Sequence, residues 1–129
     1  MRILIAVLLL TFCIPAFAAG PNDGVYGMTA GNLSPVESGF ASIHQNGDVV
    51  VFIVLNLESD GDSDWDAAQG LRTGDSAELL FLIDDGGVTV TLQFNDNLTA
   101  TITITGCAAS PIAPCDPVVG TVFDLAKVF

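Results

Sequence analysis

Apolar and polar residues alternate with a period of two along much of the chain. The clearest case is "VTVTLQFNDNLTATITIT", residues 88–105. If residues 95–97 form a three-residue loop, Phe94 faces Leu98, and the apolar residues of both arms share one face while the other face collects threonines. The further pairs would be Leu92–Ala100, Val90–Ile102 and Val88–Ile104. This alternation predicts an antiparallel hairpin with one buried face.

Two more hairpins are predicted from glycine-containing turns. "HQNGDV" places Asn46-Gly47 between two strand-like segments, and "LRTGDS" places Thr73-Gly74 in the same way. An Asn-Gly pair is the strongest short-range hairpin signal, because both central residues of the turn need a positive φ. The expected facing pairs are Gln45–Asp48, His44–Val49 and Leu71–Ser76.

Other segments favour buried strands and no helix. Residues 49–55 and 79–83 are apolar throughout, so both faces of these strands should be covered. With strands near residues 25–30 and 121–128, the chain has about eight strands, at the spacing of sandwiches and barrels. The sequence therefore predicts an all-β fold in which antiparallel strands follow one another as a meander. A small barrel or half-barrel is preferred, with a two-sheet sandwich as the alternative.

The N-terminus is typical of a secretory signal peptide. Arg2 precedes an unbroken apolar run at residues 3–10, and "AFA" at 16–18 offers small residues where a signal peptidase cleaves. Residues 1–18 are therefore predicted to be removed, so that the secreted or periplasmic chain begins at Ala19.

Size and charge limit the classes of partner. Residues 19–129 suit one domain, and no later stretch has the roughly 20 apolar residues of a transmembrane helix. The full chain has 3 Lys and Arg against 15 Asp and Glu, a formal net charge of −12. This charge repels nucleic acid and favours solubility more than it favours a basic partner.

Two cysteines remain after the predicted cleavage, Cys107 and Cys115, in "CAASPIAPC". In an oxidising compartment such an isolated pair most simply forms one disulfide. The spacing does not match a zinc site, and there is no second pair of ligands. We therefore expect a structural disulfide.

An acidic stretch, "ESDGDSDWDAAQG", supplies candidate binding residues. Aspartates at every second position can fold around Ca²⁺, which takes six to eight oxygen ligands. An EF-hand loop counted from the first of them would need glycine where Trp65 stands and glutamate where Leu71 stands, so only a looser calcium site remains possible beside a solvated turn. The candidate metal ligands are Asp60, Asp62, Asp64 and Asp66.

Trp65 is the one tryptophan of the chain. Its flat ring could stack on a sugar or another flat apolar ligand, which makes it the candidate ligand-binding residue. The alternative is an apolar anchor in the core at one end of the barrel.

Catalytic residue types are scarce. The one histidine is His44, and Ser42, two residues away on the same strand face, is expected to lie about 7 Å from it, beyond hydrogen-bond reach. No catalytic residue and no required cofactor is predicted, so we expect the protein not to be an enzyme.

These observations predict a secreted or periplasmic binding or surface module. Its partner would be a small molecule, a glycan or a protein. One alternative is an eight-stranded outer-membrane barrel, suggested by the ending "TVFDLAKVF" with its terminal Phe129. The other is an adhesive or structural domain stabilised by Ca²⁺.

Overall fold

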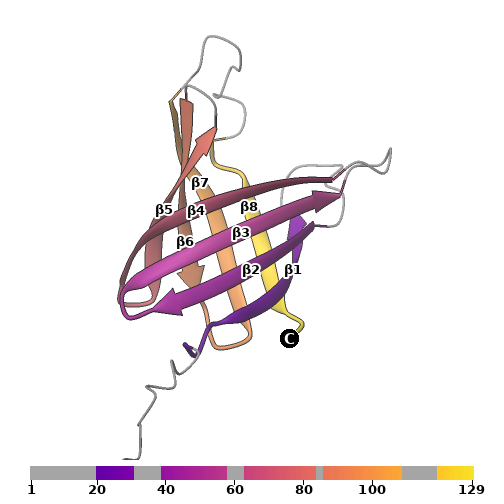
Figure 1. Ribbon diagram of the computed structural model, residues 1–129, viewed down its shortest axis with the longest axis vertical. Coiled ribbons are helices and arrows are strands. Elements are labelled where there is room, and N and C mark those ends of the chain that lie inside the picture. Colours follow the sequence, from indigo (N-terminus) through magenta and orange to yellow (C-terminus); the bar gives the residue numbers. More distant parts are fainter. Residues whose placement is uncertain (1–19, 31–38, 58–62, 84–85, 109–118) are drawn as a thin grey trace, which may run out of the picture.

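The chain folds into one closed antiparallel β-barrel (Figure 1). The computed structural model describes residues 20–30, 39–57, 63–83, 86–108 and 119–129. Each strand pairs with the next, and the first pairs with the last, which closes the barrel. The strands are β1 (Gly24–Ala30), β2 (Gly39–Asn46), β3 (Val49–Leu57), β4 (Ser63–Thr73), β5 (Ser76–Ile83), β6 (Gly86–Phe94), β7 (Thr99–Ala108) and β8 (Val122–Lys127).

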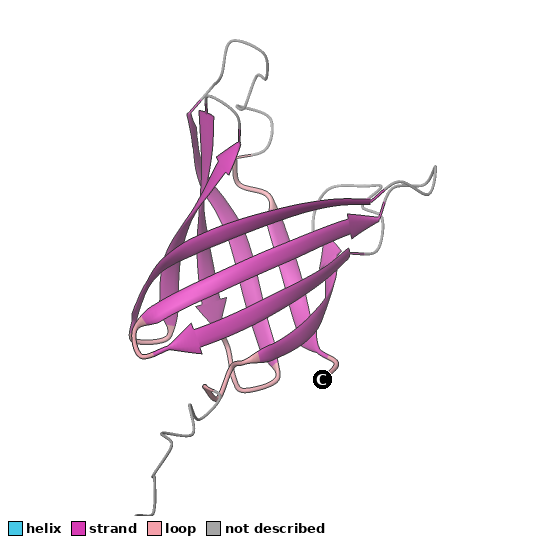
Figure 2. Cartoon of the chain, in the orientation of Figure 1, coloured by secondary structure: helices cyan, strands magenta, loops and turns pink. Residues whose placement is uncertain are grey.

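The predicted fold class is confirmed, and of the alternatives it is the barrel that forms. Strands make up the regular structure of the described residues, which include no helix (Figure 2). It follows that no helix in this part of the chain could span a membrane. The predicted signal peptide, residues 1–18, lies outside the described residues, so its removal stays a prediction.

The inward side chains fill the barrel because eight strands enclose a space about as wide as the side chains themselves. Phe52 and Phe81 meet in a T-shaped contact with ring centroids 6.0 Å apart and an interplanar angle of 88°. Such a contact adds to the burial of both rings. The most deeply buried large side chains are Tyr26, Ile43, Val50, Phe52, Leu79, Leu92 and Leu125.

The first two predicted hairpins form, but their registers are wrong by two residues. Asn46 faces Val49 across a turn of Gly47 and Asp48, and Thr73 faces Ser76 across a turn of Gly74 and Asp75. The two glycines have φ values of 62° and 63° and occupy the first central position of each turn rather than the second. Glycine satisfies the positive φ at either position, so a sequence such as "NGD" fits both registers. A slip of two residues leaves every side chain on its predicted face.

The third hairpin also pairs differently from the prediction, because its loop is longer. Phe94 faces Ala100 rather than Leu98. The Asp96 carboxylate accepts hydrogen bonds from the backbone N–H of Leu98 at 2.7 Å and of Thr99 at 2.6 Å, and from the Thr99 hydroxyl at 3.0 Å. These bonds turn the chain over residues 95–98 before β7 begins. The predicted threonine face is nevertheless the outward one, as the burial of the alternate residues requires.

The Asp96 bonds make the stability of this loop depend on pH. The bond from the Leu98 N–H, followed by the two from Thr99, lowers the pKa of Asp96 below its ordinary value of 3.8. A lowered folded-state pKa contributes stability above the unfolded pKa, and this contribution is lost as pH falls through the folded one. Asp96→Asn should therefore lower the thermal midpoint more at pH 7 than at pH 3. Asp124→Asn, at an exposed position on the outer face of β8, is the matched control; equal effects of the two substitutions would contradict the assignment.

The two ends of the barrel differ. At the end that we call the turn end lie the short connections between β2 and β3, β4 and β5, and β6 and β7. The described N-terminal residues close this end: the Tyr26 hydroxyl donates to the Asn22 carbonyl at 2.7 Å, and the Gln45 N–H donates to Asp23 Oδ1 at 2.7 Å. At the opposite end, the loop end, the strands lead into segments 31–38, 58–62, 84–85 and 109–118, which lie outside the described residues.

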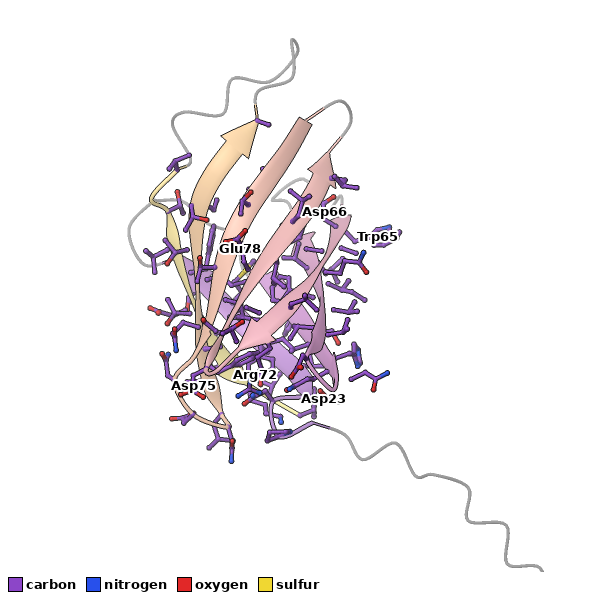
Figure 3. The ribbon with its side chains drawn as sticks, turned by 90° about the vertical axis from the view of Figure 1, so that its left-hand side faces the viewer. Asp23, Trp65, Asp66, Arg72, Asp75 and Glu78 are labelled. Carbon is purple, nitrogen blue, oxygen red and sulfur yellow. The ribbon has the colours of Figure 1, made fainter. Side chains whose placement is uncertain are left out.

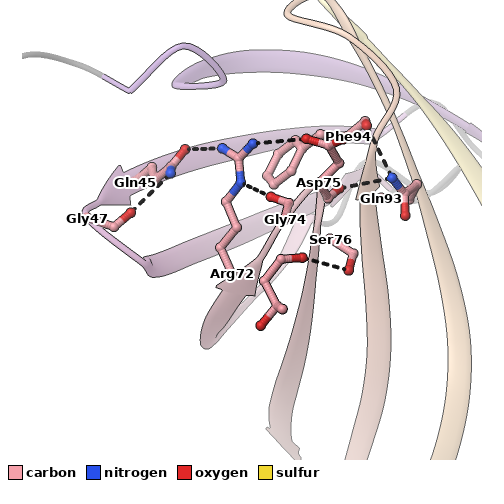
Figure 4. A network of polar contacts seen from close by, with 9 residues as sticks. Gln45, Gly47, Arg72, Gly74, Asp75, Ser76, Gln93 and Phe94 are labelled. Atoms are coloured by element: carbon pink, nitrogen blue, oxygen red, sulfur yellow. Dashed lines mark hydrogen bonds and ion pairs between the residues drawn. The ribbon is translucent and has the colours of Figure 1, made fainter.

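Arg72 completes the closure of the turn end from inside (Figure 4). Its Nε donates to the Gly74 carbonyl at 2.7 Å, and its Nη1 donates to Gln45 Oε1 at 2.9 Å. The guanidinium lies 4.8 Å from the centroid of the Phe94 ring, and its Nη2 is 3.5 Å from Asp75 Oδ1. Hydrogen bonds, an aromatic face and a carboxylate thus compensate the charge of a mostly buried cation.

Candidate functional site

The half of the barrel near the loop end contains a cavity of about 270 Å³. Several of its lining side chains, including Val54 and Val88, are only half-buried, so the cavity reaches solvent. Within the described part of the chain, the turn-end half is occupied by core side chains and closed by the Arg72 contacts, which leaves the loop end as the route of entry. The lining residues are Met28, Phe52, Val54, Asp66, Phe81, Val88, Val90, Ile102, Ile104 and Phe123.

Small inward residues on two strands help to explain the open space. Near the loop end, β2 presents Gly39 and Ala41 to the interior, and β4 presents Ala68. Other strands carry larger inward side chains, such as Phe81 on β5, which pairs with Ala68, and Ile102 on β7. An eight-stranded barrel closes completely only where large side chains meet across its axis, so a cavity remains where one side supplies little volume.

Among the described residues that line this cavity, Asp66 is the polar one. It faces inward on β4, opposite Val54 in the register, and is half-buried. The strand alternation sends its neighbour Trp65 to the outer face, where Figure 3 shows the indole pointing away from the barrel. A carboxylate thus lies at the edge of an otherwise apolar cavity.

The four predicted metal ligands do not all lie on one loop. Asp60 and Asp62 lie outside the described residues. Asp64 belongs to β4, opposite Asn56, and Asp66 lines the cavity. Among the residues that the structure describes, no three His, Cys, Asp or Glu side chains are grouped closely enough to hold a metal ion. A calcium site that includes the undescribed acidic segment stays a prediction.

Trp65 is not the core anchor considered as the alternative, because 67% of its surface is exposed. In the strand register Phe40 faces Leu55, and Leu55 faces Trp65. Together with side chains of β5 they form an outer apolar surface, comprising Phe40, Val49, Leu55, Trp65, Leu71, Leu80 and Leu82. Any ligand contact of Trp65 would therefore be on the outside of the barrel, and its binding role stays a prediction.

Comparison with known proteins supports the architecture alone. The chain is similar to the solved structure of a redesigned β-barrel, with a TM-score of 0.61 and 12% identity, over 84% of this chain and 93% of that one. No protein-family model matches the chain, and no curated protein matches it. At such low identity the likeness shows the barrel fold and says nothing of a site.

The predicted separation of Ser42 and His44 is wrong. Ser42 Oγ lies 2.9 Å from His44 Nε2, because the long imidazole side chain spans the distance between alternate strand positions. The register places Val25 and Ile53 beside Ser42, and Val51 beside His44. The pair therefore lies among apolar neighbours on the outer face of β2, remote from the inward-facing cavity. Triad-type catalysis also needs an acid that orients the histidine, and the expectation that the protein is not an enzyme stays a prediction.

The predicted disulfide is only half within the described residues. Cys107 lies near the end of β7, opposite Val88. Cys115 lies outside the described residues, so the pairing of the two cysteines stays a prediction. Cys107 is the last residue but one of β7. The predicted disulfide would therefore join the end of β7 to the connection that follows this strand.

Proposed function

We propose that this protein is a non-enzymatic binding module that holds a small apolar ligand in the loop-end cavity. The observation that carries the proposal is the lining, in which, among the residues that the structure describes, apolar side chains from six strands surround the carboxylate of Asp66. Ligand sites are typically concave, mostly apolar and equipped with a few polar groups that orient the ligand. The predicted signal peptide supports a secreted or periplasmic location for this activity.

The size and chemistry of the cavity favour a small ligand. Its volume of about 270 Å³ is near the lower end of ligand pockets, which begin at about 300 Å³. Apolar cavities hold water poorly and accept apolar guests, because few hydrogen bonds are available to an enclosed water molecule. An aliphatic chain or a compact aromatic molecule would gain free energy by leaving water for this lining.

Saturable binding of the neutral fluorescent dye N-phenyl-1-naphthylamine to the secreted chain would test the proposal. Val54→Trp places a large side chain in the cavity and should weaken binding about tenfold or more, since the ligand then lacks the space it needs. Ile53→Trp is the matched control, because the adjacent residue faces outward on the same strand. An absence of saturable binding, or equal weakening by both substitutions, would contradict the proposal.

The second candidate is an outer-membrane barrel, favoured by the outer apolar surface on β2 to β5. Two features weigh against it. The outward residues of β6 and β7 are largely threonines, and the interior is apolar, whereas membrane barrels have an apolar outer band and a polar lumen. We expect the full chain, expressed with its own N-terminus in a Gram-negative host, to appear in the soluble periplasmic fraction. Recovery only with detergent, together with heat-modifiable gel mobility, would favour the membrane barrel instead.

A further inference from the structure

We propose that the ligand class of the loop-end cavity is an amphiphilic amine, with its apolar tail among the lining side chains and its ammonium group on the Asp66 carboxylate. This inference rests on the function proposed above and adds the chemistry of the head group. It predicts that the cavity selects for a positive charge attached to an apolar body, and against a negative one.

The position of Asp66 supports a cationic head group. The side chain is half-buried on β4 and lines the cavity among apolar residues. A carboxylate that loses part of its hydration is stabilised by an opposite charge that donates hydrogen bonds to it. An ionised carboxylate has about four lone-pair sites, so it can accept bonds from a ligand in addition to any contact that it makes within the protein. An ammonium group, with three donors, matches this capacity.

The distribution of basic residues supports the same sign. Among the described residues both basic side chains are at the turn end: Arg72 in the closure already described, and Lys127 with its Nζ 3.5 Å from the Pro21 carbonyl. Figure 3 shows Arg72 and Asp66 well apart along the barrel. The chain also carries a formal net charge of −12, which attracts cations and repels anions over the distances of an encounter. A ligand with a carboxylate head would be repelled both by this net charge and by the Asp66 carboxylate.

Isothermal titration calorimetry of the secreted chain with octylamine, octanol and octanoate tests the inference, because the three probes share a tail and differ in the head. We expect octylamine to bind about tenfold tighter than octanol, and octanoate to bind most weakly. Asp66→Asn keeps the size of the side chain and removes its charge, so it should abolish the preference for the amine while leaving octanol within about twofold. Glu78→Gln is the matched control, because it removes one negative charge from the exposed outer face of β5.

The outcomes separate the two proposals. If none of the three probes binds, the proposed function fails. If octanol and octylamine bind equally well to the wild-type protein, the cavity binds apolar ligands but the assigned head group is wrong, a result that needs no variant. An amine preference that Glu78→Gln reduces as much as Asp66→Asn would also overturn the inference, since net charge rather than the cavity carboxylate would then be responsible.

Discussion

Replacement of Phe52 by alanine is expected to lower the free energy of unfolding by about 3–5 kcal/mol. The side chain is 1% exposed and packs edge-to-face against Phe81, so its removal deletes buried apolar surface and an aromatic contact together. Closed barrels relax poorly around a lost side chain, because each strand is hydrogen-bonded on both sides. Urea unfolding followed by circular dichroism would measure the change.

The matched control is Phe40→Ala on the neighbouring strand. Phe40 is 42% exposed on the outer face of β2, so its removal should change the free energy of unfolding by less than about 1 kcal/mol. A similar cost for both substitutions would mean that the interior of the barrel is not the main source of its stability. Phe52 also lines the cavity. The free energies of unfolding of the two variants should therefore be compared before ligand binding is measured.

Replacement of Gly70 by alanine is expected to destabilise the barrel by about 3 kcal/mol or more. A Cβ at this position would overlap the carbonyl oxygen of Glu78 and lie 3.0 Å from a methyl group of Leu79. Both belong to β5, whose backbone approaches β4 closely here. Because a carbonyl in a strand ladder cannot move without breaking its hydrogen bonds, the strands themselves would have to shift.

Gly27→Ala is the control for this substitution, since Gly27 also lies in a strand and its added Cβ would have its nearest contact at 3.9 Å, with the Ala126 carbonyl oxygen. There the change should be within about 1 kcal/mol, because less backbone freedom in the unfolded chain offsets small native-state costs. Thermal and urea unfolding of both variants would measure the difference. A Gly70→Ala protein as stable as Gly27→Ala would contradict the close approach of β4 and β5.

Local patterns in the sequence predicted the strands well, and the turns less well. The alternation at residues 88–105 determined which side chains face inward, and this survived every change of register. The registers themselves depended on details that the pattern does not contain: a glycine that fits either central position of a turn, and the Asp96 carboxylate that lengthens the third loop. Closure of the barrel depends on the pairing of β1 with β8. These strands are far apart in the sequence, so local patterns cannot predict that they pair.

The cavity could not be predicted in the same way. The volume of the cavity depends on which inward side chains meet across the barrel. The effect of the small residues of β2 on this volume is known only when the side chains opposite them are known. Asp66 was grouped with the acidic loop because the aspartates are regularly spaced, yet the same spacing of two continues into β4 and puts Asp66 inside. Which of Trp65 and Asp66 faces inward follows from the pairing of β4 with β3, and the spacing of the aspartates does not contain this information. The Ser42–His44 contact was missed for another reason, since backbone spacing neglects the reach of the imidazole.

The described chain begins and ends on the same side of the barrel, because the N–H of Val25 donates to the Phe129 carbonyl at 3.1 Å beside the closed end. A fusion partner or a surface linker joined after Phe129 would consequently attach at the turn end of the barrel and lie away from the loop end. Immobilised in this way, the barrels would display their loop ends outward in a common orientation. The same geometry makes the fold suitable as a display scaffold in which the sequences of the loop-end connections vary while the attached turn end stays constant.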